Sequence, residues 1–284
     1  MVFDADGLPL DERVDFAGQS PSSFVYRMLR DVEAQAVRRA NVVLTRSGKA
    51  IEILHARAGA GTSSRKFHVV SNGRDSKLFK PVDPSLFNEI RNSLDFNIND
   101  PLIIYAGSLG GKYCLKEMLK FFSFIHARRK DSKFVILTSS PDLVKSMLEI
   151  FPLIKPNITS LYAQNSLVAK YLSCADLGLA FIRPSYSMQA ASAIKIGEYL
   201  LSGLPVIGTP GIGDSNEICA RGGYVLRNML EDDLIAAADW FIDSVLPQRE
   251  NYRKSSRALG MNRFSLEASA ESYRQALQHF KVGP

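Results

Sequence analysis

The strongest constraint on the fold is a regular alternation of apolar runs and helix-length segments that begins at Leu102. Five segments, most of them apolar, have the length of a strand, and each is followed by a polar or glycine-containing loop: Leu102–Ala106, Phe134–Thr138, Ile158–Tyr162, Leu177–Phe181 and Pro205–Gly208. A sixth strand is expected at Gly223–Leu226. Repeated βα units form a parallel sheet covered by helices on both faces, and strands buried in this way are apolar throughout. We therefore predict an α/β fold with a doubly wound parallel sheet.

The helices between these strands are expected at Tyr113–Lys130, Asp142–Phe151 and Ser166–Cys174. The last of them would be capped by Asn165 or Ser166, since both side chains can accept a hydrogen bond from a backbone N–H. A helix capped by Asp83-Pro84 is expected to run through Ile90 to about Leu94, and two further helices, at Glu231–Leu246 and Leu266–His279, are expected to complete the chain.

The N-terminal part of the chain is much less complete. Residues 1–75 offer two helices and two or three strands, at Ser23–Arg39, Ser47–Arg57, Val42–Leu44 and Phe67–Val70. That is too little for a domain with a large core of its own. We predict that residues 1–75 are the end of a longer N-terminal domain, that residues 76–265 form the doubly wound domain, and that residues 266–284 cross back to the N-terminal part.

The composition is that of a globular protein whose surface favours anions. The chain has 284 residues, a net charge of +6 and a pI of about 9.2, which permits binding to nucleotide diphosphates, acidic lipid surfaces or nucleic acid. The basic residues are scattered, and the run Arg128-Arg129-Lys130 is better explained as a solvated helix end, so no nucleic-acid partner is expected. No apolar run has the length of a membrane span, and the N-terminus lacks the features of a signal peptide. A cytoplasmic protein is expected, with peripheral contact to the inner face of a membrane as an open alternative.

The segment Ser192–Thr209 carries the clearest sign of a binding site. Lys195 and Glu198 share one face of a short helix. Gly203 follows at the position after the helix end that often adopts the left-handed conformation, and a buried strand comes next. A helix with polar groups in its first turn is typical of the nucleotide-binding corner of a doubly wound domain. The alternative is an exposed ion pair within the helix, worth a few tenths of a kcal/mol.

Other loops at the same edge of the sheet are weaker candidates. The loop Gly107–Lys112 contains Ser108 and three glycines, which allow a ligand to approach the backbone, and Lys112 adds a charge suited to a diphosphate. Tyr162 could lie against a nucleobase. The loop Ile182–Ser192 is long and rich in small residues. The same residues can also be explained without a ligand. Gly107–Lys112 would then be a tight turn with a surface lysine, and Thr138–Asp142 and Tyr162–Asn165 would be ordinary helix caps. In the loop Gly208–Asp214, Asp214 is either a polar contact or a cap.

No arrangement of catalytic or metal-binding residues is recognisable. The four histidines are dispersed, and there is no Ser/His/Asp triad, Cys-x-x-Cys or H-E-x-x-H motif. Cys114, Cys174 and Cys219 have no metal-ligand spacing and are expected to be buried free thiols. No catalytic residue, metal or cofactor is therefore assigned.

Several segments, in the same order, resemble the family 4-like retaining glycosyltransferases of GT-B fold. The segment Lys195-x-x-Glu198-Tyr199-Leu200-x-x-Gly203-Leu204-Pro205-Val206-Ile207 is similar to the family's KxxEYLxxGxPVI signature. Three softer matches are Val69–Pro81 to the interdomain PNG(V)D…F.P segment, Ile104–Lys112 to YxGxL…K, and Ala175–Leu179 to ADxxL. The resemblance covers most of the chain but only the end of the acceptor-binding domain, so we expect a piece of a longer protein. Within that end, Asp11-Glu12-Arg13 is expected to lie in a loop.

The resemblance implies two Rossmann-like domains and a nucleoside-diphosphate sugar as donor substrate. It implies that Glu198 contacts the ribose and that Lys112 contacts the diphosphate, with backbone N–H groups around Met188, Gln189, Ala190 and Ala191. Ala190 stands where the family's E-x₇-E motif has its first glutamate, and Ser108 stands where an arginine is common. These departures leave the donor-sugar contact open and give Lys112 more of the phosphate charge.

The function implied by the resemblance is the transfer of a hexose to a glycan or lipid-linked acceptor, with no cofactor besides the donor. Two alternatives stay open. The chain could bind a nucleotide without catalysis, because most of the acceptor domain is absent. It could also be a sugar-nucleotide epimerase, although the scarcity of histidines argues against that.

Overall fold

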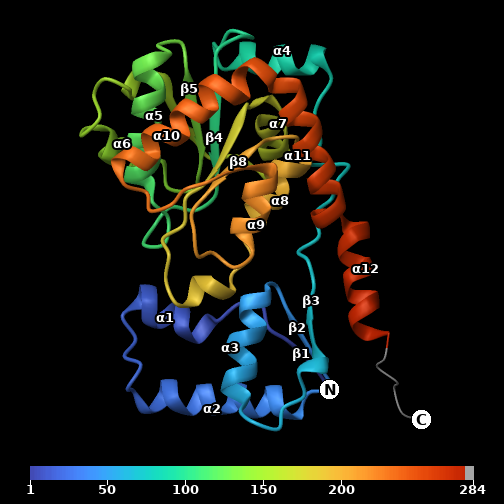
Figure 1. Ribbon diagram of the computed structural model, residues 1–284. Coiled ribbons are helices and arrows are strands. Elements are labelled where there is room, and N and C mark those ends of the chain that lie inside the picture. Colours follow the sequence, from blue (N-terminus) through green and yellow to red (C-terminus); the bar gives the residue numbers. More distant parts are fainter. Residues whose placement is uncertain (279–284) are drawn as a thin grey trace.

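The computed structural model describes residues 1–278, which form two parallel sheets, one above the other (Figure 1). The larger sheet has six strands in the order β6-β5-β4-β7-β8-β9, and the smaller has three in the order β1-β2-β3. The strands of the large sheet are β4 (Leu102–Ala106), β5 (Lys133–Leu137), β6 (Ile158–Leu161), β7 (Leu177–Ala180), β8 (Val206–Gly208) and β9 (Gly223–Val225). Those of the small sheet are β1 (Val2–Asp4), β2 (Val42–Thr45) and β3 (Phe67–Val69). All the pairings are parallel.

The strand order of the large sheet is the doubly wound order of Rossmann folds. The chain first moves outward from β4 through β5 to β6, then returns to β7 and moves outward the other way. The predicted α/β fold is confirmed, and its switch point lies between β4 and β7. The small sheet lies within residues 1–75 and the large sheet within residues 76–265, while the domain boundaries themselves stay predictions.

Helices cover both faces of the large sheet. They are α4 (Pro84–Ser93), α5 (Leu115–Arg128), α6 (Pro141–Leu148), α7 (Asn165–Cys174), α8 (Ile194–Leu201), α9 (Ser215–Gly222), α10 (Glu231–Trp240) and α11 (Arg249–Phe264). Alternate residues of β4 face opposite sides: Ile103 and Tyr105 pack in the core under α5 and α10, and Leu102 and Ile104 pack in the core under α7 and α8. The lower lobe has α1 (Pro9–Ala17), α2 (Phe24–Arg39), α3 (Gly48–Ala58) and, against its sheet, α12 (Leu266–Leu277).

Three helices were missing from the sequence prediction. Helix α1 contains Asp11-Glu12-Arg13, so the predicted loop there is wrong; Asp11 is buried between Arg30 and Arg57. Helix α9 follows the loop that ends at Asp214. Helix α11 has no apolar stripe, because the buried residues are Ser256, Gly260 and Phe264 and only the last is a large apolar side chain. A Cβ on Gly260 would lie 2.6 Å from the backbone N of Leu201, so glycine lets α11 approach α8 closely.

Other boundaries also differ from the prediction. The helix expected at Glu231–Leu246 ends at Trp240 and continues as a π turn, Phe241–Val245. The cap of α7 is Gln164, without a side-chain hydrogen bond, rather than Asn165 or Ser166. The predicted end of the last helix, His279, lies outside the described residues. Cys174 and Cys219 are buried and Cys114 is half-buried; all three are free thiols.

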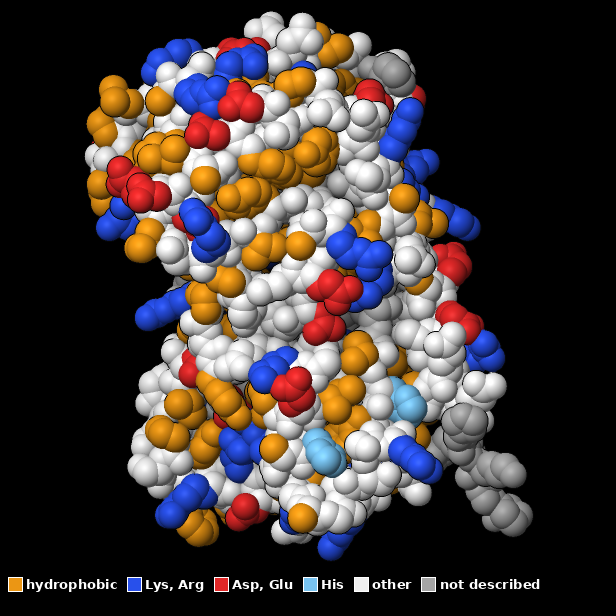
Figure 2. All heavy atoms as spheres, in the orientation of Figure 1, with side chains coloured by type: hydrophobic (Ala, Val, Ile, Leu, Met, Phe, Trp, Pro, Cys, Tyr) orange, Lys and Arg blue, Asp and Glu red, His pale blue; other side chains and the backbone are white. Residues whose placement is uncertain are grey.

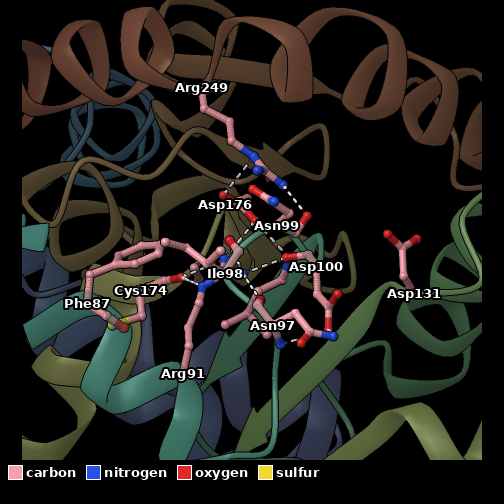
Figure 3. A network of polar contacts seen from close by, with 12 residues as sticks. Phe87, Arg91, Asn97, Ile98, Asn99, Asp100, Asp131, Cys174, Asp176 and Arg249 are labelled. Atoms are coloured by element: carbon pink, nitrogen blue, oxygen red, sulfur yellow. Dashed lines mark hydrogen bonds and ion pairs between the residues drawn. The ribbon is translucent and has the colours of Figure 1, made fainter. Parts of the chain in front are cut away.

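The amino ends of the central strands are closed by a buried polar network (Figure 3). Arg91 of α4 is 1% exposed and donates to Asp176 and to the carbonyls of Cys174 and Asp100. Asp176 also accepts the N–H of Leu102 and pairs with Arg249 of α11. These contacts join α4, β4, β7 and α11.

The two lobes are joined by the segment 70–83 and by α12. Tyr273 and Ala276 pack against Val42, Leu44 and Val70, and Ser269 donates to the carbonyl of Ser71. From the other side, Gly48 donates its N–H to Asp214, which follows β8. The carboxyl edges of the two sheets therefore face each other, and the loops of the large sheet lie between them (Figure 1).

Candidate functional site

A cavity of about 200 Å³ lies at the carboxyl edge of the large sheet. It is formed by the ends of the three adjacent strands β4, β5 and β6 and by one residue each of α7 and α8, with the lining residues Ala106, Gly107, Leu137, Thr138, Ser139, Tyr162, Ala163, Val168 and Glu198. Because ligands of doubly wound sheets bind beyond the carboxyl ends of the strands, near the switch point, this cavity has the expected place for a nucleotide site. Tyr162 is 69% exposed and stands at its rim.

Glu198 is the acidic group of the cavity and pairs with Arg74. The Arg74 Nε lies 3.1 Å from the Glu198 Oε1, and both side chains are about three-quarters buried. Burial raises the pKa of Glu198, and the nearby Arg74 opposes that rise. The interaction joins α8 to the segment between the lobes, and it fixes in place a carboxylate that lines the cavity.

Lys195 lies one turn before Glu198 but makes no ion pair with it. The Lys195 side chain is buried, and its Nζ has no hydrogen-bond partner within the part of the chain that the structure describes. The ammonium lies over the rings of Tyr105 and Tyr113, 3.9 and 4.4 Å from their centroids. The alternative of an exposed intrahelical ion pair between Lys195 and Glu198 is therefore wrong.

Lys112 stands at the rim and is engaged by the lower lobe. Its Nζ lies 2.5 Å from the Glu12 Oε1 of α1, and both side chains are about one-third exposed. In the loop before it, Gly107 has φ +144, a conformation that favours glycine. The carbonyl of Ser108 accepts a hydrogen bond from the Tyr105 hydroxyl.

The segment Met188–Ala191 faces the lower lobe rather than the cavity. Ser187–Ala190 forms a 3₁₀ turn, and the N–H groups of Gln189 and Ala191 bond to carbonyls of the same loop. Ala190 is fully buried in the core of the small sheet, beside Ala5 and Leu54. The N–H of Ser187 donates to Asp15 of α1. The Ala190 side chain therefore has no access to a ligand in this arrangement.

The structure thus brings together only part of the predicted set. Gly107, Tyr162 and Glu198 line one cavity, with Lys195 beneath Gly107, whereas Lys112 and Met188–Ala191 contact the lower lobe. Two further residues belong to the site. Thr138, expected in a helix cap, lines the cavity, and Arg74 holds Glu198. Arg74 lies in the NGRD segment between the lobes, but nothing in its sequence neighbourhood indicates a partner 124 residues away.

A second cavity, of about 310 Å³, lies between the lobes on the other side of α8. Its polar lining includes Arg46, Asp214 and Arg263. Arg46 is held by Asp4 and Asn72, and Asp214 accepts the N–H of Gly48, so much of this polarity is used in joining the lobes.

Within residues 1–278, no group of three or more His, Cys, Asp or Glu side chains is arranged to hold a metal ion. Over the same range, none of the helices has both the length and the apolar composition of a membrane crossing. On the face seen in Figure 2, acidic and basic side chains alternate rather than forming one basic patch.

Comparison with known proteins identifies the architecture. No protein-family profile and no curated protein matches the sequence. Among solved structures, HepE from Anabaena in complex with UDP superposes with a TM-score of 0.76, at 17% identity, over 98% of this chain and 71% of HepE. The fold is that of the GT-B glycosyltransferases.

Other GT-B structures give the same result. WaaG, a glycosyltransferase involved in lipopolysaccharide biosynthesis, has a TM-score of 0.73 at 17% identity, covering 99% of this chain and 75% of WaaG. Sucrose-phosphate synthase from Thermosynechococcus elongatus has a TM-score of 0.70 at 16% identity, covering 98% of this chain and 67% of the synthase. The predicted GT-B fold, with a partial second Rossmann-like lobe at the N-terminus, is confirmed.

Proposed function

We propose that this chain binds a nucleoside-diphosphate sugar and belongs to a glycosyltransferase. The observation that carries the proposal is the cavity at the switch point, with Glu198 held at its mouth by Arg74. A carboxylate in this place can accept hydrogen bonds from ribose hydroxyls, as acidic residues do in dinucleotide sites. The structural similarity to HepE, which was solved with UDP and with UDP-glucose, supports this interpretation.

In the proposed complex, each part of the donor meets a different group. The nucleobase enters the cavity between Thr138 and Tyr162, and the ribose lies against Glu198. The diphosphate lies near the start of α8, whose N-cap residue Ala193 makes no side-chain cap, so backbone N–H groups there are available to an anion. Lys112 and Lys195 supply positive charge for the leaving phosphate.

We further propose that the sugar is a hexose, transferred with retention to a glycan or lipid-linked acceptor held by the N-terminal part of the protein. Apart from the donor, no cofactor is part of the proposal. A cytoplasmic location, with contact to the inner face of a membrane, would suit a lipid-linked acceptor.

Nucleotide binding tests the first step. UDP, GDP and ADP are titrated by calorimetry into the wild type, into Glu198→Gln and into the control Glu217→Gln, which changes an exposed glutamate of α9. One nucleotide should bind to the wild type and to the control. Glu198→Gln should weaken its binding by about 10- to 100-fold, since a hydrogen bond to a charged group contributes about 1.5–3 kcal/mol. The proposal is wrong if none of the three nucleotides binds, or if Glu198→Gln binds as tightly as the wild type.

A nucleotide-binding module without catalysis is the second candidate. It is favoured by Ala190, which is buried in the small sheet and offers no acidic group to a donor sugar. Product analysis with radiolabelled nucleotide sugar and a panel of glycan acceptors separates the candidates: transfer supports the enzyme, and binding without any turnover supports the module.

A further inference from the structure

The buried lysine of α8 has no counter-charge. The Lys195 side chain is 9% exposed, and its Nζ has no hydrogen-bond acceptor among the described residues. Its neighbours are the faces of Tyr105 and Tyr113. Attraction to aromatic faces stabilises a cation less than water does, so an ammonium ion in this position is costly.

The charged and titratable groups around Lys195 are already engaged. On its own helix, Glu198 pairs with Arg74. On the loop before α5, Lys112 is a like charge and pairs with Glu12. On β4, the hydroxyl of Tyr105 donates to the carbonyl of Ser108. Burial, together with Lys112, lowers the pKa of Lys195 to about 7, and Glu198 only partly opposes this effect.

The same amine lies directly against the proposed donor site. A Cβ on Gly107 would lie 2.8 Å from the Lys195 Nζ, so the amine touches the backbone that lines the cavity. Lys195 is also in the first turn of α8, where N–H groups without a side-chain cap favour a negative charge. An anion bound here would supply the counter-charge that Lys195 lacks among the described residues.

We propose that Lys195 determines the specificity of the site for a diphosphate: at pH 8 its amine is mostly neutral in the free protein, and it takes up a proton from solvent when a diphosphate binds beside it. The proton binds to the lone pair of the Nζ, and no other bond forms or breaks. A nucleoside without phosphates supplies no anion and leaves the amine neutral. This inference rests on the proposed function of the site and specifies how the site recognises charge.

The experiment measures proton uptake on binding. UDP-glucose, GDP-glucose and ADP-glucose are suitable probes, because their diphosphates do not titrate near pH 8. Each is titrated by calorimetry at pH 8 in two buffers of different ionisation enthalpy, and the difference in apparent binding enthalpy gives the number of protons exchanged. The wild type should take up about 0.9 proton per bound nucleotide sugar, the fraction of a group of pKa about 7 that is neutral at pH 8.

Three variants separate Lys195 from other proton sources. Lys195→Arg carries a permanent charge and should bind without proton uptake. Lys195→Met should bind at least 10-fold more weakly, also without uptake, and should lose the preference for the nucleotide sugar over the nucleoside. Lys155→Met, which changes an exposed lysine in an ion pair with Glu149, should behave as the wild type.

The outcomes distinguish the two proposals. Binding with no proton uptake in the wild type, or with equal uptake in Lys195→Met, overturns the role of Lys195 and leaves the proposed function standing. If none of the three nucleotide sugars binds, both the function and the inference that rests on it are wrong.

Discussion

Replacing Lys195 by methionine should make the protein more stable while it weakens donor binding. Methionine has nearly the shape of lysine, so it fills the space against Tyr105 and Tyr113 without a charge. The fall in the pKa of Lys195 from 10.5 to about 7 corresponds to about 5 kcal/mol, at 1.36 kcal/mol per pH unit. Lys195→Met should therefore raise the free energy of unfolding by about 4–5 kcal/mol at pH 6.

The gain should shrink as the pH rises. A lysine whose pKa is lowered by folding destabilises the folded state most below its folded pKa, because the folded protein then holds the charged amine in an unfavourable site. The penalty disappears as the pH approaches 10.5, because the lysine is then neutral in the unfolded chain as well. The difference between variant and wild type should fall to about 1 kcal/mol at pH 10.

Urea unfolding followed by circular dichroism at pH 6, 8 and 10 measures this difference. Lys112→Met is the matched control, since Lys112 is partly exposed and its pairing with Glu12 should contribute less than about 1 kcal/mol. If Lys195→Met is less stable than the wild type at pH 6, or if its advantage does not change with pH, then Lys195 is not a buried group without a counter-charge.

Three further variants test one contact at the site and two contacts in the fold that supports it. Glu12→Gln should release Lys112 and tighten nucleotide-sugar binding by about 2- to 5-fold, consistent with a partly exposed ion pair; weaker binding in calorimetry would contradict the role of Lys112. Gly178→Ala should lower the free energy of unfolding by about 1–3 kcal/mol in urea, because its Cβ would lie 2.5 Å from the Cδ2 of the buried Tyr199; unchanged stability would show that α8 can shift. Arg91→Met should lower the free energy of unfolding by about 3–5 kcal/mol, because it leaves buried Asp176 with one cation fewer and several carbonyls without a donor. A loss under about 1 kcal/mol in the same assay would mean that Arg249 alone is enough to stabilise the buried Asp176.

The sequence predicts the large sheet well because its strands are buried on both faces. The central strands β4, β5, β7 and β8 are nearly continuous apolar runs, and the order of strands and helices leaves few alternatives to a doubly wound sheet. Helix α11 escapes prediction for the opposite reason. Its buried residues are Ser256, Gly260 and Phe264, and Gly260 and Phe264 lie against α8, so the buried face carries only one large apolar side chain and no apolar period.

The sequence indicates at which edge of the sheet the candidate site lies, but not which residues contact one another there. Glu198 and Gly107 follow from the rule that ligands bind beyond the carboxyl ends of strands. Their partners depend on contacts between distant segments: Arg74 is 124 residues from Glu198, and Glu12 is 100 residues from Lys112. The position of Ala190 in the core of the small sheet likewise depends on how the lobes meet, which no local pattern reports.

The structure of crystals of this protein soaked with UDP tests most directly the central claim that the cavity lined by Glu198 binds the nucleotide of the donor. The account predicts the uracil ring in the cavity between Thr138 and Tyr162, the ribose hydroxyls within hydrogen-bond distance of Glu198, and the diphosphate beside Lys195. UDP bound instead in the cavity between the lobes, against Arg46 or Arg263, would contradict it.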